Sequence, residues 1–136
     1  MSTFYLVFLR KGSLLVVGHQ ELICYTVFYM IQFDDVVKVE MTIGLIIEVE
    51  VIEESNKLYK LTVDFGEEET RTVLSGIRKL ITIEELVGKK AAFVTNLEPR
   101  PMLGMESQAM ILAASTDDEF SLLEVGQNIP QGTRIL

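Results

Sequence analysis

Residues 58–97 read LYKLTVDFGEEETRTVLSGIRKLITIEELVGKKAAFVTNL and set out most of the architecture of this chain. In residues 58–65, polar and apolar residues alternate, which predicts a strand with one apolar face. The apolar positions are Tyr59, Leu61, Val63 and Phe65, which we expect to face the core. After the acidic turn GEEE, residues 70–77, TRTVLSGI, predict a second strand that ends at Ser75 and Gly76.

A short helix is predicted in residues 82–88, TIEELVG. Thr82 and Glu85 have the spacing of a capping box, in which each side chain accepts a hydrogen bond from the other residue's backbone amide. Gly88 suits the left-handed position that commonly follows a helix. Residues 90–97, KAAFVTNL, then predict another strand.

Two further strands flank this stretch. Upstream, residues 36–52 alternate between apolar and polar positions over a length too great for a flat strand, and Gly44 in the middle predicts a bulge or sharp coil. Downstream, residues 107–115, SQAMILAAS, predict a strand that ends at the turn TDDE. The tail, residues 120–136, predicts one or two short strands around a Pro-Gly turn.

Five strands in this order, with a helix between the third and the fourth, predict an all-β chain with an OB-fold. We expect a five-stranded Greek-key barrel with one short helix and a C-terminal strand extension, formed by residues 34–136. A different barrel, or a sandwich with the same number of strands, accommodates the same pattern.

Residues 1–33 differ in composition, being rich in aromatic residues and nearly free of acidic ones. Their apolar runs are interrupted by RKGS and GHQE, so none reaches the length of a membrane span. Arg10 and Lys11 follow the first apolar run, unlike the basic residues of a secretory signal. This segment predicts either a hairpin that turns at residues 11–13 or an extension outside the domain, with Met30 as an internal start; no membrane partner is expected.

Composition excludes several classes of function. The chain has 136 residues, enough for one domain with a sizeable core. Its single cysteine, Cys24, excludes a disulfide framework and a multi-cysteine zinc site, and agrees with a cytoplasmic protein. With one histidine, His19, and no Walker loop or dinucleotide fingerprint, we expect no catalytic residues, no metal and no cofactor. A net charge of −8 disfavours nucleic-acid binding except through a local basic patch.

The most specific stretch is NLEPRPMLGMESQAMILAAS, residues 96–115, which places several polar residues between two apolar segments. Together with KLYKLTVDFGEEETRTVLSGI, EELVGKK and IPQGTRI, it resembles the tRNA-binding domain family of the EMAP II type. This module is appended to some methionyl-tRNA synthetases and also occurs as a separate beta subunit. The resemblance implies an OB-fold whose C-terminal extension forms a homodimer. It also implies a tRNA binder without chemistry of its own, which assists the catalytic subunit of an aminoacyl-tRNA synthetase.

The resemblance further implies that Asn96 and the segment PR…G.ESQ lie along the RNA-facing edge of the barrel. Nearby cations would contact phosphates, and Ser75 would offer a hydroxyl to a phosphate or a base. The alternatives are a solvated surface for the cations, a plain turn at Ser75, solvent exposure for Gln108, and side-chain capping of the corner for Asn96 and Ser107. The candidate RNA-binding residues are Lys57, Lys60, Arg71, Ser75, Arg78, Asn96, Arg100, Ser107 and Gln108.

The chain also departs from the family at positions that are commonly basic, where it has Glu98, Pro101 and Leu103. We therefore expect weak phosphate binding. We expect the methionines of the same stretch to fill gaps in the core more than to line a binding surface. The first hypothesis is a structure-specific tRNA-binding module. The alternative is a chaperone-like or assembly-bridging protein, since an acidic surface suits a peptide or protein partner.

Overall fold

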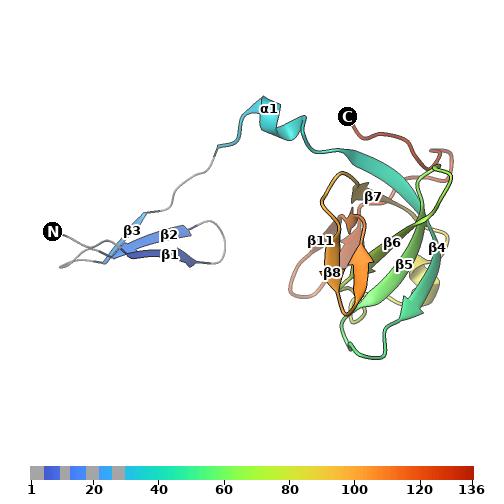
Figure 1. Cartoon of the computed structure of the whole chain (residues 1–136), viewed down its shortest axis with the longest axis horizontal. Coiled ribbons are helices and arrows are strands. Elements are labelled where there is room, and N and C mark those ends of the chain that lie inside the picture. Colours follow the sequence, from blue (N-terminus) through green and yellow to red (C-terminus); the bar gives the residue numbers. More distant parts are fainter. Residues whose placement is uncertain (1–4, 10–12, 18–21, 26–29) are drawn as a thin grey trace. The chain divides into compact units, whose positions relative to one another are not determined.

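The computed structural model describes residues 5–9, 13–17, 22–25 and 30–136. The chain divides into two compact units, Met1–Val37 and Lys38–Leu136. The first unit contains a three-stranded antiparallel sheet in the order β1 (Tyr5–Leu9), β2 (Ser13–Val17), β3 (Leu22–Tyr25), followed by the short helix α1 (Phe33–Val36) (Figure 1). Residues 11 and 12 of the expected hairpin turn, and His19, lie outside the described residues.

Helix α1 corrects the prediction that the long strand begins at Val36. The backbone N–H of Gln32 donates to the Asp35 carboxylate at 3.3 Å, and the N–H of Asp35 donates to the Gln32 carbonyl at 2.9 Å. This reciprocal pairing stabilises a helical turn in place of an extended chain. The strand, β4 (Met41–Val51), consequently begins at Met41.

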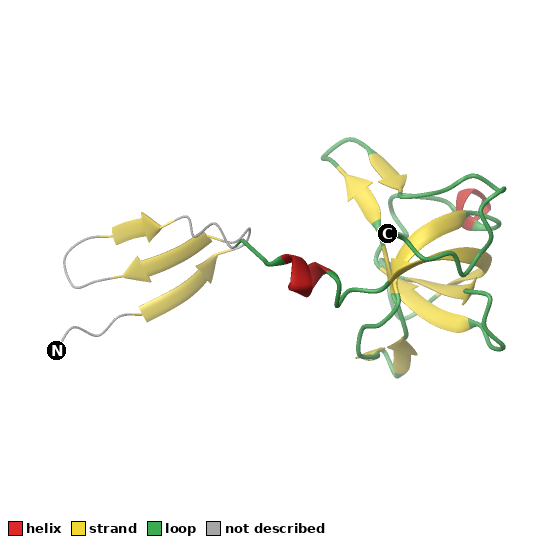
Figure 2. Ribbon diagram, turned by 90° about the horizontal axis from the view of Figure 1, so that it is seen from above, coloured by secondary structure: helices red, strands yellow, loops and turns green. Residues whose placement is uncertain are grey.

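The second unit is the predicted five-stranded antiparallel barrel with little helix. Figure 2 shows its strands in yellow and its short helix in red. The sheet has the order β10–β7–β4–β5–β6, and helix α2 (Ile83–Leu86) lies between β6 and β7 in the chain. Contacts between β6 and β10 bring the two edges of the sheet together, as in an OB-fold. The other four strands of the barrel are β5 (Tyr59–Asp64), β6 (Arg71–Ser75), β7 (Lys90–Val94) and β10 (Met110–Ile111).

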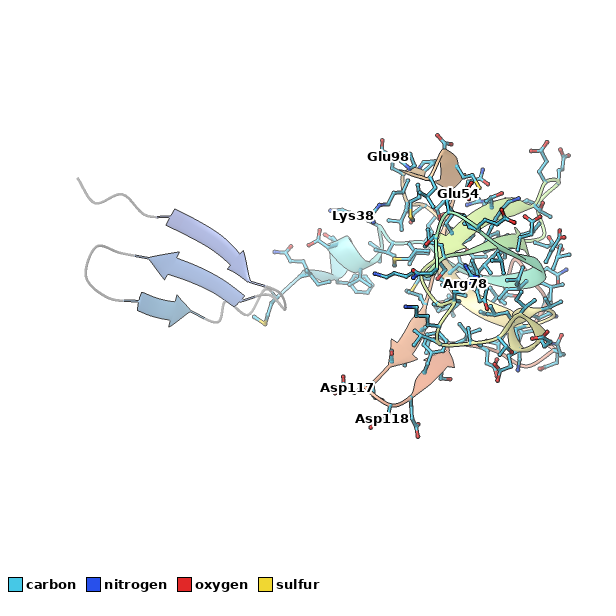
Figure 3. All side chains as sticks on the ribbon, turned by 90° about the horizontal axis from the view of Figure 1, so that it is seen from below. Lys38, Glu54, Arg78, Glu98, Asp117 and Asp118 are labelled. Carbon is cyan, nitrogen blue, oxygen red and sulfur yellow. The ribbon has the colours of Figure 1, made fainter. Side chains whose placement is uncertain are left out.

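The sequence pattern predicts a single strand over residues 107–115, but the structure does not contain one. Ser107 ends β9 (Met105–Ser107), which pairs with β8 (Arg100–Met102). Of the predicted strand, only β10 pairs with β7, and β11 (Ala113–Ser115) turns away to pair with β12 (Phe120–Leu122). The strand divides because its residues have three different partners. Figure 3 shows the two resulting hairpins extending on opposite sides of the barrel.

Strand β4 bends at Ile47, where its register with β5 shifts between Ile46 and Glu48. The bulge puts Ile46 in the core and leaves Ile47 46% exposed, which reverses the alternation there. The prediction of a bulge at Gly44 is therefore wrong. A Cβ at Gly44 would lie 2.5 Å from Val63 Cγ1, so this glycine allows close packing inside the barrel.

The core of the barrel contains the side chains that the alternation in β5 predicts, namely Tyr59, Leu61, Val63 and Phe65. The ring of Phe65 meets that of Phe93, which is fully buried, edge-to-face at 5.2 Å. The Tyr59 hydroxyl donates to the Ile81 carbonyl at 3.2 Å, which satisfies its one polar group.

Helix α2 confirms the predicted capping box. Thr82 Oγ1 accepts from the Glu85 N–H at 3.4 Å, and the Glu85 carboxylate accepts from the Thr82 N–H at 3.0 Å. The bonds from Thr82 hold the pKa of Glu85 below its ordinary value. Gly88 follows with φ +83°, and Leu86 of the helix is fully buried in the core.

The C-terminal tail covers the β4–β7 side of the barrel through bridges Ala91↔Glu124 and Thr42↔Arg134. Lys90 is 9% exposed, and its ammonium donates to the carbonyls of Gln127 and Ile129 at 3.0 and 2.8 Å. These bonds fasten the tail to β7. Within the part of the chain that the structure describes, no helix has the length and apolar character needed to cross a membrane.

Candidate functional site

A groove of about 470 Å³ lies between the end of β6 and the β8–β9 hairpin. OB-folds bind oligonucleotides on the face of their second and third strands, between the loops that follow the first and the fourth strands. In this chain those strands are β5 and β6, and the loops are residues 52–58 and 95–109. The groove is lined by Leu74, Ser75, Gly76, Leu97, Glu98, Arg100, Met102, Ser107, Ala109, Met110 and Ile111.

The β8–β9 hairpin turns at Leu103 and Gly104, which have φ of 50° and 75°. Two successive positive φ values define the tight turn whose twist matches antiparallel strands. The register places Arg100 opposite Ser107 at the base of the hairpin. The hairpin thus holds Arg100 beside the groove.

Ser107 has a structural part in the site. It is 7% exposed, and its Oγ accepts from the Leu74 N–H at 3.0 Å and donates to the Ala109 carbonyl at 3.1 Å. The hydroxyl therefore joins the edge of β6 that no described strand pairs with to the segment that follows the hairpin. Its proton and an acceptor position are both used within the protein.

Gln108 continues this closure of the barrel. Its side-chain oxygen accepts from the Thr72 N–H at 2.8 Å, and its own N–H donates to the Thr72 carbonyl at 2.9 Å. Side chain and backbone together take the place of a neighbouring strand along β6. The residue is exposed, but its amide oxygen is occupied.

Asn96 joins the start of the domain to the end of β7. Its Oδ1 accepts from the Glu40 N–H at 2.9 Å, and its Nδ2 donates to the Lys38 carbonyl at 2.6 Å. Asn96, Ser107 and Gln108 thus each bond a backbone group that is distant in the sequence, which gives all three a structural part at this corner of the barrel.

Three of the candidate cations also have partners within the protein. Lys60 donates to the Glu50 carboxylate at 2.5 Å, which raises the pKa of its ammonium, and nearby Glu48 adds to the effect. Arg78 donates to the carbonyls of Ile52 and Ser55 and so holds the loop between β4 and β5.

Arg71 has the most extensive set of partners. Its guanidinium forms two bonds with the Glu67 carboxylate, at 2.9 and 2.6 Å, and a third with the Thr95 carbonyl at 2.8 Å. It also lies over the Phe65 ring, 5.3 Å from the centroid. A phosphate at this position would have to displace Glu67.

The charged side-chain groups of three other cations have no hydrogen-bond or ion-pair partner among the described residues, namely those of Lys57, Lys79 and Arg100. Lys57 lies in the loop between β4 and β5, and Lys79 lies between β6 and α2. Of the three, Arg100 lines the groove. A cation without a carboxylate partner can neutralise a phosphate without first breaking an ion pair.

The sequence interpretation missed the apolar lining of the groove. Leu97 and Met110 are 47% and 48% exposed, so the expectation that the methionines fill the core is wrong for Met110. In the sequence, an apolar residue that lines a groove looks the same as one that packs in the core, so the pattern could not separate the two.

The acidic residues Asp117 and Asp118 lie at the tip of the β11–β12 hairpin (Figure 3). The described residues contain no cluster suited to a metal.

The barrel, the hairpin and the groove define a class of protein, the small OB-fold modules. These modules bind oligomeric ligands such as oligonucleotides at one face of the barrel. Residues 41–134 match the family model described as "Putative tRNA binding domain". The chain belongs to this tRNA-binding domain family.

Relatives of known sequence agree with this assignment. The methionine–tRNA ligase of Methanococcus maripaludis is 42% identical over 106 residues, and that of Deinococcus radiodurans is 44% identical over 107. Each match covers 78% of this chain and 16% of the ligase. The chain therefore spans about a sixth of the length of these relatives.

Solved structures show the same fold. A MetRS related protein from Pyrococcus horikoshii superposes with a TM-score of 0.74 and 41% identity, over 80% of this chain and all of that one. The chaperone CsaA from Bacillus anthracis superposes with a TM-score of 0.70 and 26% identity, over 79% of this chain and all of that one.

Proposed function

We propose that this chain is a structure-specific tRNA-binding module, an accessory of methionyl-tRNA synthetase with no catalytic chemistry of its own. The observation that carries the proposal is Arg100, an unpaired cation beside a groove at the edge of the barrel where OB-folds bind oligonucleotides. The tRNA-binding family and the methionine–tRNA ligase relatives support tRNA as the nucleic acid that is bound. Its partners are tRNA and the catalytic subunit of the synthetase, in the cytoplasm.

In this proposal, residues 34–136 form the RNA-binding domain and residues 1–33 are an extension from it. Lys57, Lys79 and Arg100 supply the phosphate contacts. Asn96, Ser107 and Gln108 hold the loops in position, and Lys60, Arg71 and Arg78 contribute where RNA displaces their present partners.

A second candidate function is that of a chaperone-like module for a peptide. Two observations favour it: the similarity to CsaA, and a groove whose lining is mostly apolar. An acidic chain also suits a basic or apolar peptide better than RNA.

Binding of tRNA should be weak and should depend on salt to a limited degree. Three phosphate contacts, each contributing roughly 0.7–0.9, give a slope of log affinity against log salt of about −2 to −3. Replacing Arg100 by alanine should reduce the magnitude of this slope by about 0.7–0.9 and weaken different tRNAs equally, because phosphates carry no sequence information. Fluorescence anisotropy titrations over a range of salt concentrations measure both quantities.

The control for this experiment is Arg134→Ala, which removes an arginine that is paired with Glu40 at 3.6 Å and lies outside the groove. It should leave the slope unchanged. Absence of tRNA binding even at low salt, together with binding of an unfolded peptide or of the catalytic subunit, would replace the tRNA proposal by the second candidate.

We also propose that the chain forms a symmetric homodimer through its C-terminal extension. A second, more apolar hollow of about 420 Å³ lies between the tail and strands β4 and β7. Leu123 at its edge is 49% exposed. Light scattering at micromolar concentration should therefore give twice the monomer mass, and Leu123→Glu should return it to one. A monomer mass for the unaltered chain would contradict this proposal.

A further inference from the structure

We propose that the groove beside β6 holds one unpaired base of the RNA, with the neighbouring phosphate on Arg100. This inference rests on the proposed tRNA binding and specifies which part of the RNA the groove accepts. The base would lie against Leu97, Met102, Met110 and Ile111, and the cation would stand at the rim.

The shape and the lining of the groove favour a base. Its volume, about 470 Å³, falls within the roughly 300–1,000 Å³ typical of small-ligand sites. A paired helix presents phosphates, riboses and the edges of its bases, which apolar side chains do not recognise. An unstacked base presents a flat apolar face, and proteins bind such faces on apolar and aromatic surfaces.

The methionines at the groove are chemically suited to this task. The polarisable thioether makes favourable contacts with aromatic rings, and its unbranched chain adapts to bases of different size. Met110 is 48% exposed, so its side chain is available to a ligand without rearrangement of the core. The described lining contains no aromatic residue, so the contact would be sequence-tolerant packing on aliphatic groups.

Polar groups at the rim define how a nucleotide would enter. The hydroxyl of Ser75 and the guanidinium of Arg100 have no partner among the described residues, whereas the hydroxyl of Ser107 is already paired with Leu74 and Ala109. Ser75 is therefore the hydroxyl that can reach a base edge. Glu98 also lines the groove, and its negative charge offsets part of the attraction between Arg100 and a phosphate.

A peptide side chain could occupy the same apolar space, but it does not account for the unpaired guanidinium. An arginine next to an apolar surface provides a phosphate contact and a planar surface at once. Single-stranded nucleic acid uses this combination, because its bases and its charges alternate along one strand.

Two variants test the base site. Met110→Ser removes an exposed part of the lining. Gly76→Leu fills the space, since a Cβ at Gly76 would meet no atom within 4 Å and its φ lies outside the left-handed region. Met110→Ser should weaken tRNA binding roughly 2- to 10-fold, the loss that corresponds to one thioether–ring contact. Gly76→Leu should weaken it at least as much, because the leucine excludes the base. The salt slope should remain as in the unaltered chain, because no charge is removed.

The control is Leu80→Ser, at an apolar residue that is 51% exposed and outside the groove, which should leave binding unchanged. Thermal unfolding shows whether each variant is folded. A short single-stranded RNA should compete with tRNA, and the same RNA annealed to its complement should compete less well.

The results distinguish the two proposals. If tRNA binds and both groove variants bind it as well as the unaltered chain, the base site is wrong while the tRNA proposal stands. If duplex competes better than single strand, the base site is also wrong. If neither tRNA nor single-stranded RNA binds at low salt, both proposals fail. An apolar peptide that binds and is lost in the groove variants would then identify the occupant.

Discussion

Replacing Phe93 by alanine should lower the free energy of unfolding by about 3–5 kcal/mol, the usual cost of truncating a buried aromatic residue. Phe93, the residue before the last one of β7, is fully buried, and its ring meets that of Phe65 edge-to-face at 5.2 Å. The truncation leaves a cavity and removes this contact. Because Gly44 packs closely against the same ring, the neighbouring strand has few side-chain atoms with which to fill the space.

Urea unfolding followed by circular dichroism measures this effect as a lower midpoint with an unchanged slope. The matched control is Phe33→Ala, because Phe33 is 77% exposed and its loss should change stability by less than about 0.5 kcal/mol. A loss of similar size in both variants would show that Phe93 is not at the centre of the core.

Replacing Ser107 by alanine should destabilise the domain by about 1–3 kcal/mol, because the Leu74 N–H loses its acceptor in a buried position. The Ala109 carbonyl loses a donor at the same time. Since these bonds join β6 to the residues after the hairpin, the wall of the groove should shift and tRNA binding should weaken. The salt slope should not change, because serine carries no charge.

The control for this variant is Ser75→Ala, at a residue that lies at the same groove and whose hydroxyl has no hydrogen-bond partner among the described residues. It should leave stability within about 0.5 kcal/mol of the unaltered chain. The two serines thus separate closure of the barrel from contact with a ligand. If Ser107→Ala loses tRNA binding at unchanged stability, Ser107 contacts the RNA directly.

The specific sequence of the β8–β9 region reflects two structural tasks that the same residues must perform. Residues 96–108 must close the barrel along β6, where ordinary strand pairing ends, and must also place the groove. Ser107 and Gln108 perform the first task through bonds to Leu74 and Thr72, while Asn96 bonds Glu40 and fixes the start of the segment. Arg100 and the apolar residues remain for the second. A motif shared with a binding family can therefore consist largely of residues that support the site.

The cations show why net charge is a poor guide to an interface. Glu50 and Glu67 form ion pairs with Lys60 and Arg71, two residues that the sequence identifies as candidates for RNA binding. Exposed ion pairs contribute little to stability, so RNA could displace them at modest cost. Until that happens, the available positive charge on the described part of the chain is smaller than the count of basic residues suggests.

The elements that the sequence alone determined are those whose cause is local. The alternation of residues 58–65 determined β5, because a strand with one buried face needs apolar residues at every second position. Thr82 and Glu85 determined the start of α2, because a capping box is formed within one turn. The order of strands and helix then favoured the OB-fold, but a different barrel or a sandwich with the same number of strands accommodated the same pattern until strand pairing was known.

Only the tertiary structure decided the features that depend on distant residues. The role of Gly44 follows from Val63, Phe65 and Phe93, which reach it from other strands. The bulge fell at Ile47, and the predicted fifth strand divided among three partners, because pairing between strands overrides the alternation within one. Whether a cation is free depends in the same way on its neighbours in space: Arg71 is held by the carbonyl of Thr95, the residue after β7, whereas Arg100 on its hairpin remains open to a ligand.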